Sequence, residues 1–355
     1  MRTRAIALAV SGCALIGACA DPSARTERSS LDALVIARPV DARVLDPARI
    51  VDEESAEVAA HLFDGLVRLA PDGRDFLPAL AEHWSTSDDG LVWTFQLRAG
   101  LRFADGAAVD AEAVRFSFAR QFEPGHPAAV PAPNPWSVRF PDVVSVDATG
   151  PLTVEIRLRR RFAPLLSNLT TVTAAVVSPA SLHPDRPATL RDPSGAAIPV
   201  GSGTYRLFDW RHGERIVLER RADDGRPRTG MARLVFETVA DAHARLTALE
   251  SGAADLASAI FPSELRYIEL HPRLRLVRAA ANNVSFVAFN TRRAPFADVR
   301  VRRAVGHAIN KTPIVQLAYQ GLATPADGAI PSGVWGHAAT AARVSYDPAA
   351  ARSLL

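Results

Sequence analysis

Both cysteines of this 355-residue chain, Cys13 and Cys19, lie within its first 19 residues. The rest of the chain therefore has no disulfide, no thiol nucleophile and no cysteine metal site. It must be held together by a hydrophobic core, which a chain of this length can bury without covalent cross-links. At roughly 150 residues per domain, the length predicts two or more lobes.

The N-terminal residues have the pattern of an export signal. Arg2 and Arg4 precede a short apolar run over residues 5–18, which is too short to span a bilayer as a mature helix. Small residues come directly before Cys19, and this arrangement resembles a bacterial lipoprotein signal. We expect residues 1–18 to be removed and Cys19 to be acylated, with palmitate among the chains, because several acyl chains on one residue anchor a protein stably.

Two alternatives to this interpretation remain open. The signal could be an ordinary secretory one in which the cysteine is incidental, or Cys13 could be the acylated residue, although its apolar run would be very short. Residues 19–30 are polar and contain proline, serine and charged residues, which is typical of a flexible tether. We therefore expect a soluble body tethered outside the cytoplasm to the cell envelope, on its periplasmic side.

The charge balance argues against a nucleic-acid partner. The formal net charge is +3, and removal of Arg2 and Arg4 leaves 39 basic against 38 acidic residues. No basic block with interleaved aromatic residues is present, whereas nucleic-acid binding usually requires a basic patch.

Periodicity and turn residues predict alternating strands and helices. We expect strands at residues 31–37, 91–97, 143–146, 152–158, 205–210, 215–220, 274–277 and 284–290. We expect helices at 55–66 and 110–122, and helices that begin at the caps Asp241, Ser263, Asp298, Thr312 and Asp347. This order is typical of an α/β or mixed α+β chain with more than one lobe.

Two glycines and three tryptophans of the sequence are expected to have structural roles and not to form a ligand site. Gly201 and Gly203 are expected to let the backbone pack closely at the start of a strand. They cannot form a dinucleotide loop, because Arg206 occupies the place of its third glycine. The tryptophans at 84, 93 and 210 are assigned to the core in preference to a ligand platform.

Several short blocks, taken together and in order, resemble the bacterial extracellular solute-binding proteins of family 5, which serve oligopeptide, dipeptide and nickel importers. The resemblance covers residues 45–355, and each block alone is weak. The blocks are Leu45-Asp46-Pro47, His61-Leu62-Phe63-Asp64-Gly65-Leu66, Pro78-Ala79-Leu80-Ala81-Glu82-His83-Trp84, Trp93-Thr94-Phe95, Phe103-Ala104-Asp105-Gly106, Pro199-Val200-Gly201-Ser202-Gly203-Thr204-Tyr205, Ala288-Phe289-Asn290-Thr291, Val301-Arg302-Arg303-Ala304 and Tyr346-Asp347-Pro348.

The resemblance implies a two-lobed periplasmic-binding-protein-like fold with an extra small domain, which closes on its ligand by a hinge motion. Carried onto this chain, it assigns residues 31–54 and 191–285 to the first lobe, 55–190 to the extra domain and 286–355 to the start of the second lobe. Members of the family continue well past the block at 346–348, so we expect this second lobe to be incomplete and the chain to be truncated at its C-terminus.

The resemblance also implies a function and a set of partners. The chain would capture peptides or similar small solutes and deliver them to the permease of an ABC importer, as a monomer without cofactor or metal. Arg38, Asn290, Thr291 and Trp335 are the residues expected to face the ligand. Arg38 could pair with a ligand carboxylate or form an exposed salt bridge. Asn290 could form hydrogen bonds with ligand amides, or a structural hydrogen bond where the strands cross between the two lobes.

Other function classes are weighed against this one. An exported hydrolase is not favoured, because the chain has no G-x-S-x-G or H-E-x-x-H motif and its nine histidines are scattered singly. A receptor that presents its ligand to a sensor, or a remnant that no longer functions, remains an alternative.

Overall fold

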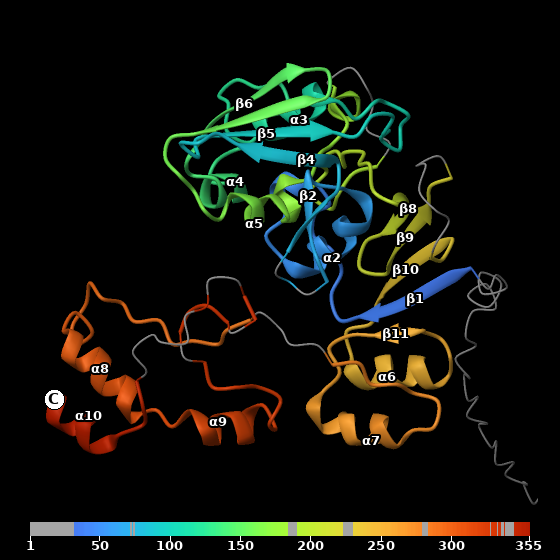
Figure 1. Cartoon of the computed structure of the whole chain (residues 1–355). Helices are drawn as coiled ribbons and strands as arrows, with labels where there is room; N and C mark the ends of the chain where they lie inside the picture. The colour runs from blue at the N-terminus through green and yellow to red at the C-terminus, as the bar shows by residue number, and fades with distance from the viewer. Residues whose placement is uncertain are drawn as a thin grey trace, which may run out of the picture.

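The computed structural model describes residues 32–71, 73, 75–183, 190–222, 230–278, 283–326, 328–331, 333, 334, 337 and 344–355. Figure 1 shows two parts. Residues 32–278 form a body that contains two main sheets, and residues 283–355 form a separate segment with helices α8, α9 and α10. We call these two parts the body and the C-terminal segment. The predicted boundaries between lobes at residues 54, 190 and 285 remain a prediction.

One sheet of the body joins strands that are far apart in the sequence. Its order is β11-β1-β10-β9-β8, in which β1 pairs in parallel with β10 and β11 while β8, β9 and β10 are antiparallel. The strands are β1 (Ala33–Arg38), β8 (Tyr205–Arg211), β9 (Arg215–Arg220), β10 (Arg233–Thr238) and β11 (Leu256–Ala257). Strands β1, β8 and β9 match predicted strands, whereas β10 and β11 were not predicted.

Helix α2 (Glu53–Leu62) packs its apolar face into the core of this sheet. Asp52 caps the helix by accepting a hydrogen bond of 2.8 Å from the amide of Ser55. Val58 and Leu62, at helical spacing, are buried among sheet residues such as Ile216. The prediction of a helix here is confirmed, although the helix begins and ends a few residues earlier than expected.

The second sheet and its helices form a separate core. The antiparallel order is β4-β5-β7-β6, with β2 (Val67–Leu69) and β3 (Phe76–Pro78) paired beside it. The strands and the longest covering helix are β4 (Ala81–Thr86), β5 (Val92–Leu97), β6 (Val143–Gly150), β7 (Thr153–Leu158) and α3 (Ala111–Ala119). The predicted hairpin is confirmed, because β6 and β7 pair in antiparallel orientation. Val154, Ile156 and Leu158 of β7 are all buried on one face.

Short elements complete the body. They are η1 (Pro47–Arg49), α4 (Pro135–Arg139), α5 (Leu165–Leu169), η2 (Val172–Ala174), η3 (Pro179–Leu182), α6 (Ala242–Glu250), η4 (Pro262–Glu264) and α7 (Leu265–Leu270). The predicted cap of α6 is confirmed, because Asp241 accepts a hydrogen bond from the amide of Ala244. Ser263 is not a cap: it lies inside η4, and α7 begins at Leu265 without a side-chain cap.

Two glycines allow the strand β8 to start directly against helix α2. A Cβ atom on Gly201 would lie 2.0 Å from the carbonyl oxygen of Leu62, and one on Gly203 would lie 2.4 Å from that of His61. The amide of Gly203 donates a hydrogen bond of 2.9 Å to Leu62. The predicted close approach of backbones is therefore confirmed.

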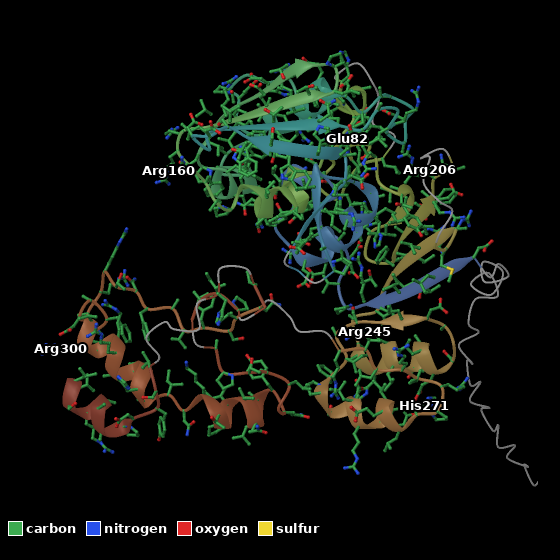
Figure 2. All side chains as sticks on the ribbon, viewed as in Figure 1. Glu82, Arg160, Arg206, Arg245, His271 and Arg300 are labelled. Atoms are coloured by element: carbon green, nitrogen blue, oxygen red, sulfur yellow. The ribbon has the colours of Figure 1, made fainter. Side chains whose placement is uncertain are left out.

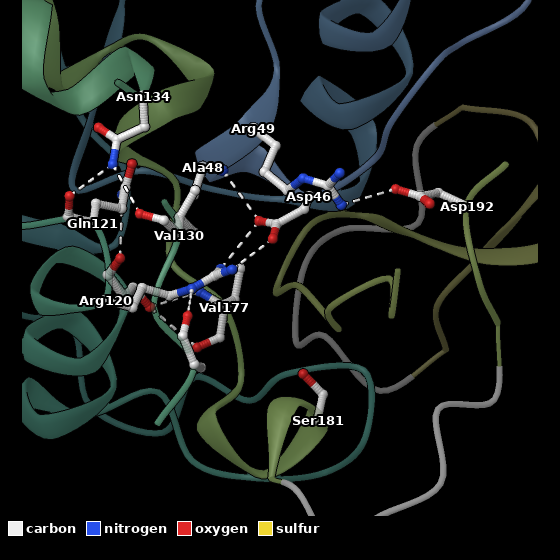
Figure 3. A network of polar contacts seen from close by, with 12 residues as sticks. Asp46, Ala48, Arg49, Arg120, Gln121, Val130, Asn134, Val177, Ser181 and Asp192 are labelled. Carbon is white, nitrogen blue, oxygen red and sulfur yellow. Dashed lines mark hydrogen bonds and ion pairs between the residues drawn. The ribbon is translucent and has the colours of Figure 1, made fainter. Parts of the chain in front are cut away.

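A buried ion pair connects the segment after β1 to the second sheet (Figure 3). Arg120, at the end of α3, donates to both carboxylate oxygens of Asp46, at 3.0 and 2.5 Å. Its Nε also donates to the carbonyl of Ala128. Asn134 holds the same loop by donating to the carbonyls of Gln121 and Val130. Bidentate geometry of this kind fixes both distance and orientation.

The C-terminal segment contains α8 (Val299–Ala308), α9 (Lys311–Ala318) and α10 (Pro348–Leu354). Asp298 and Asp347 cap α8 and α10 as predicted. Thr312 does not cap α9, because Asn310 precedes it and accepts a hydrogen bond from its amide.

Two predicted strands are wrong. Residues 274–277 and 284–290 have no strand pairing in the structure. A strand-like sequence forms a strand only when a partner strand is beside it, because its backbone groups are bonded between strands.

Candidate functional site

The parallel strands of the first sheet end together at one edge. Arg38, the last residue of β1, is in register with Thr238 of β10, and Ala37 is in register with Ala257 of β11. In open α/β sheets, ligands bind outside the carboxyl ends of such strands. We call the three segments that follow these strands the candidate edge; they are residues 39–46, 239–241 and 258–261. The head of the β1 arrow in Figure 1 points toward the side on which the C-terminal segment lies.

Arg38 is buried at this edge, with 1% of its surface exposed. Its Nη1 donates a hydrogen bond of 2.8 Å to the carbonyl of Glu54, and its Nη2 donates one of 3.3 Å to Asp41. The guanidinium lies 5.2 Å from the ring centroid of Phe236 and 3.8 Å from the carboxylate of Glu57. Burial lowers the pKa of Arg38, while Glu57 and Asp41 act in the opposite direction. The exposed salt bridge considered for Arg38 is therefore wrong, and its contact with a ligand remains a prediction.

Asp41 fixes the loop that follows β1. Its Oδ1 accepts a hydrogen bond of 2.8 Å from the amide of Ala42. Its Oδ2 accepts one of 3.0 Å from Nε1 of Trp210 and one of 2.9 Å from the amide of Gly213. These bonds attach the loop to the hairpin of β8 and β9 and leave Val40, which is 43% exposed, at the surface of the edge.

Arg245, on helix α6, holds the other two segments of the edge (Figure 2). Its side chain is buried and donates to four backbone carbonyls. Nη1 contacts Val239 and Ala240 at 2.7 and 2.9 Å, directly after β10. Nε and Nη2 contact Ser258 and Ala259 at 3.0 and 2.7 Å, directly after β11. This role of Arg245 was not predicted, because no local sequence pattern indicates that one arginine bonds two loops.

The backbone at this edge is strained at one residue. Ala259 has a φ of 54°, in the left-handed region that non-glycine residues rarely adopt. Strained residues of this kind occur preferentially at ligand sites and persist only where neighbouring bonds hold them, as Arg245 does here. Phe261 follows and is exposed, so the edge presents apolar side chains on a fixed backbone.

The remaining predicted site residues lie elsewhere. Asn290 and Thr291 are exposed in the C-terminal segment, where Oδ1 of Asn290 accepts a hydrogen bond of 3.1 Å from the amide of Arg292. In the described part of the chain, no hydrogen bond or ion pair joins either of them to Arg38. Trp335 and Cys19 lie outside the described residues. Among the residues that the structure describes, no three His, Cys, Asp or Glu side chains gather as metal ligands would.

The comparison with protein families matches most of the chain. Residues 75–355 match the model of the bacterial extracellular solute-binding proteins, family 5, middle region. The chain belongs to family 5 of the bacterial extracellular solute-binding proteins. This confirms the resemblance read from the ordered blocks.

Individual relatives of this family 5 protein agree with that assignment. Heme-binding protein A of Haemophilus influenzae is 31% identical over 327 residues, which cover 87% of this chain and 58% of the relative. The glutathione-binding protein GsiB of Escherichia coli K12 is 29% identical over 328 residues, which cover 91% of this chain and 60% of the relative. The chain thus spans about three fifths of the length of these relatives.

A solved structure of the family has the same fold. The periplasmic binding protein DppA of Helicobacter pylori, in complex with the peptide STSA, matches with a TM-score of 0.79 and 27% identity. The match covers 91% of this chain and 65% of DppA. The predicted fold class, mixed α/β of the periplasmic-binding-protein type, is thereby confirmed. Of the helices in the described ranges, none has both the length and the hydrophobicity needed to cross a bilayer.

Proposed function

We propose that this family 5 protein is the solute-binding component of an ABC importer and that it holds peptides or similar small solutes at the candidate edge. The observation that carries the proposal is the shared end of β1, β10 and β11, at which Arg38, Asp41 and Arg245 fix the backbone. A backbone held in place at such an edge can present apolar side chains, here Val40 and Phe261, for contact with a solute.

The names of the relatives supply the probes. DppA was solved with a tetrapeptide, and other relatives are named for the binding of glutathione and heme. We further propose that Asn290, Thr291 and Trp335 contact the solute from the second lobe. The protein would act as a monomer, without catalysis, anchored through Cys19 outside the cytoplasm, and would deliver its solute to a permease.

A thermal-shift experiment tests the proposal. The probes are a mixture of di- to pentapeptides, reduced glutathione and haemin, each added to the full chain. A bound solute at 100 times its dissociation constant stabilises the folded state by about 2.7 kcal/mol, which raises the melting temperature. If no probe raises the melting temperature, the proposed function is wrong.

A matched pair of variants tests the location. Val40→Asp places a charge on the candidate edge, whereas Val144→Asp places one on β6, at a residue that is 55% exposed. Both should leave the melting temperature of the free protein nearly unchanged. Val40→Asp should abolish the shift that a probe causes and Val144→Asp should retain it, and the reverse result would place the site elsewhere.

A further inference from the structure

Two buried polar atoms lie at the contact between helix α3 and the short helix η2. Gln121, just after α3, is 5% exposed, and Thr173, in η2, is 1% exposed. Among the residues that the structure describes, neither Oε1 of Gln121 nor Oγ1 of Thr173 has a hydrogen-bond partner. A buried amide oxygen or hydroxyl without a hydrogen bond costs free energy, and such groups in proteins are bonded to protein or to ordered water.

The orientation of the Gln121 amide is fixed by two carbonyl groups. Its Nε2 donates hydrogen bonds of 3.2 Å to the carbonyl of Ser117 and 3.1 Å to the carbonyl of Thr173. Exchange of the two amide atoms would place Oε1 against these carbonyl oxygens, and none of the three oxygens can donate a hydrogen bond. Oε1 is therefore the amide atom that still requires a donor.

The two side chains meet at this contact but do not bond to each other. The hydrogen bond from Nε2 of Gln121 to the carbonyl of Thr173 brings the two residues together. No hydrogen bond joins Oε1 of Gln121 to Oγ1 of Thr173 in this described part of the chain. The carbonyl oxygens of Ser117 and Thr173 each have a second lone pair. A buried water typically makes about three hydrogen bonds to groups of this kind.

The charged residue next to this contact is already paired. Arg120 precedes Gln121 in the chain and donates through Nη1 and Nη2 to Asp46 and through Nε to the carbonyl of Ala128 (Figure 3). The amide of Gln121 and the hydroxyl of Thr173 are themselves neutral. Because burial of an ion without a counter-charge costs far more than burial of a neutral molecule, the partner that these atoms require is neutral.

We infer that one internal water molecule binds between Gln121 and Thr173, where it donates a hydrogen bond to Oε1 and forms another with Oγ1. The water connects the end of α3 to η2, next to the hydrogen bond of 2.9 Å that the amide of Val177 donates to Oγ of Ser117. It is a structural part of the body, and the inference does not depend on the proposed solute function.

The sign of the stability change in Thr173→Val tests the inference, in the full chain made unlipidated by Cys19→Ser. If the hydroxyl bonds a held water, its loss leaves the water and Oε1 with fewer bonds and lowers the midpoint of urea unfolding. If the hydroxyl has no partner, replacement by a methyl group removes an unpaired polar atom and raises the midpoint. We expect a lower midpoint, and an unchanged or higher one would overturn the inference. Thr149→Val, at an exposed position of β6, is the control and should change the midpoint little.

A double-mutant cycle and direct detection of the water complete the test. Gln121→Met removes the amide, whose bond to Thr173 goes to a backbone carbonyl that Thr173→Val retains, so coupling between the two variants reports on Oε1 and Oγ1. The double variant should lose less stability than the sum of the single losses. Oxygen-17 relaxation dispersion counts long-lived internal waters, and Thr173→Val should hold one fewer than its parent. Additive losses, or an equal number of waters, would show that no water bridges the two side chains.

Discussion

Nε1 of Trp210 donates a hydrogen bond of 3.0 Å to Oδ2 of Asp41, across 169 residues of sequence. The other carboxylate oxygen of Asp41 accepts from Arg38, so one side chain connects strand β8 to the end of strand β1. The position of the candidate edge therefore depends on a contact between the first and later parts of the sheet.

Substitution of Asp41 should be costly. Asp41→Ala would leave Nη2 of the buried Arg38 and the indole of Trp210 without their acceptor, and removal of one member of a buried pair costs about 3 kcal/mol or more. Glu112→Ala, which removes an exposed pair with Arg115, should cost less than about 1 kcal/mol. Urea unfolding of both variants measures the difference, and equal losses would contradict the role assigned to Asp41.

A side chain at Gly201 should disrupt the contact between β8 and α2. Its Cβ would overlap the carbonyl oxygen of Leu62, a backbone atom that cannot rotate away. We expect Gly201→Ala to lower the free energy of unfolding by about 3 kcal/mol. Gly195→Ala is the control: Gly195 has a φ of 81° and open space around its Cβ, so only backbone strain of about 1–2 kcal/mol applies. A milder effect at Gly201 than at Gly195 would refute the steric argument.

The ion pair of Asp46 and Arg120 should show strong coupling. Each single substitution, Asp46→Asn or Arg120→Met, leaves the partner buried without its full set of bonds. A double-mutant cycle should therefore give a coupling energy of about 2 kcal/mol, with the double variant more stable than the sum of single losses predicts. Additive losses would show that the pair contributes no direct interaction.

His61 should make stability depend on pH. Its ring lies 5.9 Å from the rings of Tyr205 and Phe236, and burial lowers its pKa below the ordinary value of 6.5. In the interval between the lowered pKa and 6.5, the unfolded chain binds a proton that the folded chain does not. Stability therefore rises with pH in this window and falls as pH drops below about 6.5, by at most about 1.4 kcal/mol per pH unit.

The His61→Gln variant isolates this contribution. Chemical denaturation at a series of pH values should show a shallower loss below pH 6.5 in the variant than in the parent. Identical slopes in the two proteins would mean that His61 titrates alike in the folded and unfolded states.

The proposed anchor can be tested at its two candidate cysteines. Metabolic labelling with radioactive palmitate should label the parent chain and the Cys13→Ser variant. The Cys19→Ser variant should remain unlabelled and leave the membrane fraction. Label retained by Cys19→Ser and lost from Cys13→Ser would assign the acylated residue to position 13.

Local patterns predicted the elements whose determinants lie within a few residues. Alternation identified the strand at 92–97, and Asp110, Asp241 and Asp298 identified helix starts, because a cap needs only the next turn of backbone. The prediction that Thr312 caps a helix was wrong because Asn310, two residues earlier, is the cap. The strand predicted at residues 284–290 was wrong because strand formation depends on a partner strand that the local sequence does not specify.

The candidate site was less accessible to sequence reasoning. Arg38 was among the predicted ligand residues, but its burial depends on Phe236 and on the position of α2. The role of Arg245 depends on two loops that meet only when β10 and β11 align with β1. Such roles arise from the sheet topology, and no spacing of residue types along the chain indicates them.

The four bonds of Arg245 have a mechanical consequence. One planar group, carried by a single helix, contacts the first residues beyond two separate strands. A shift of either loop alone would stretch bonds that the other loop still satisfies. Both loops and α6 should therefore move as one rigid unit, so that any hinge motion of this molecule has to bend elsewhere.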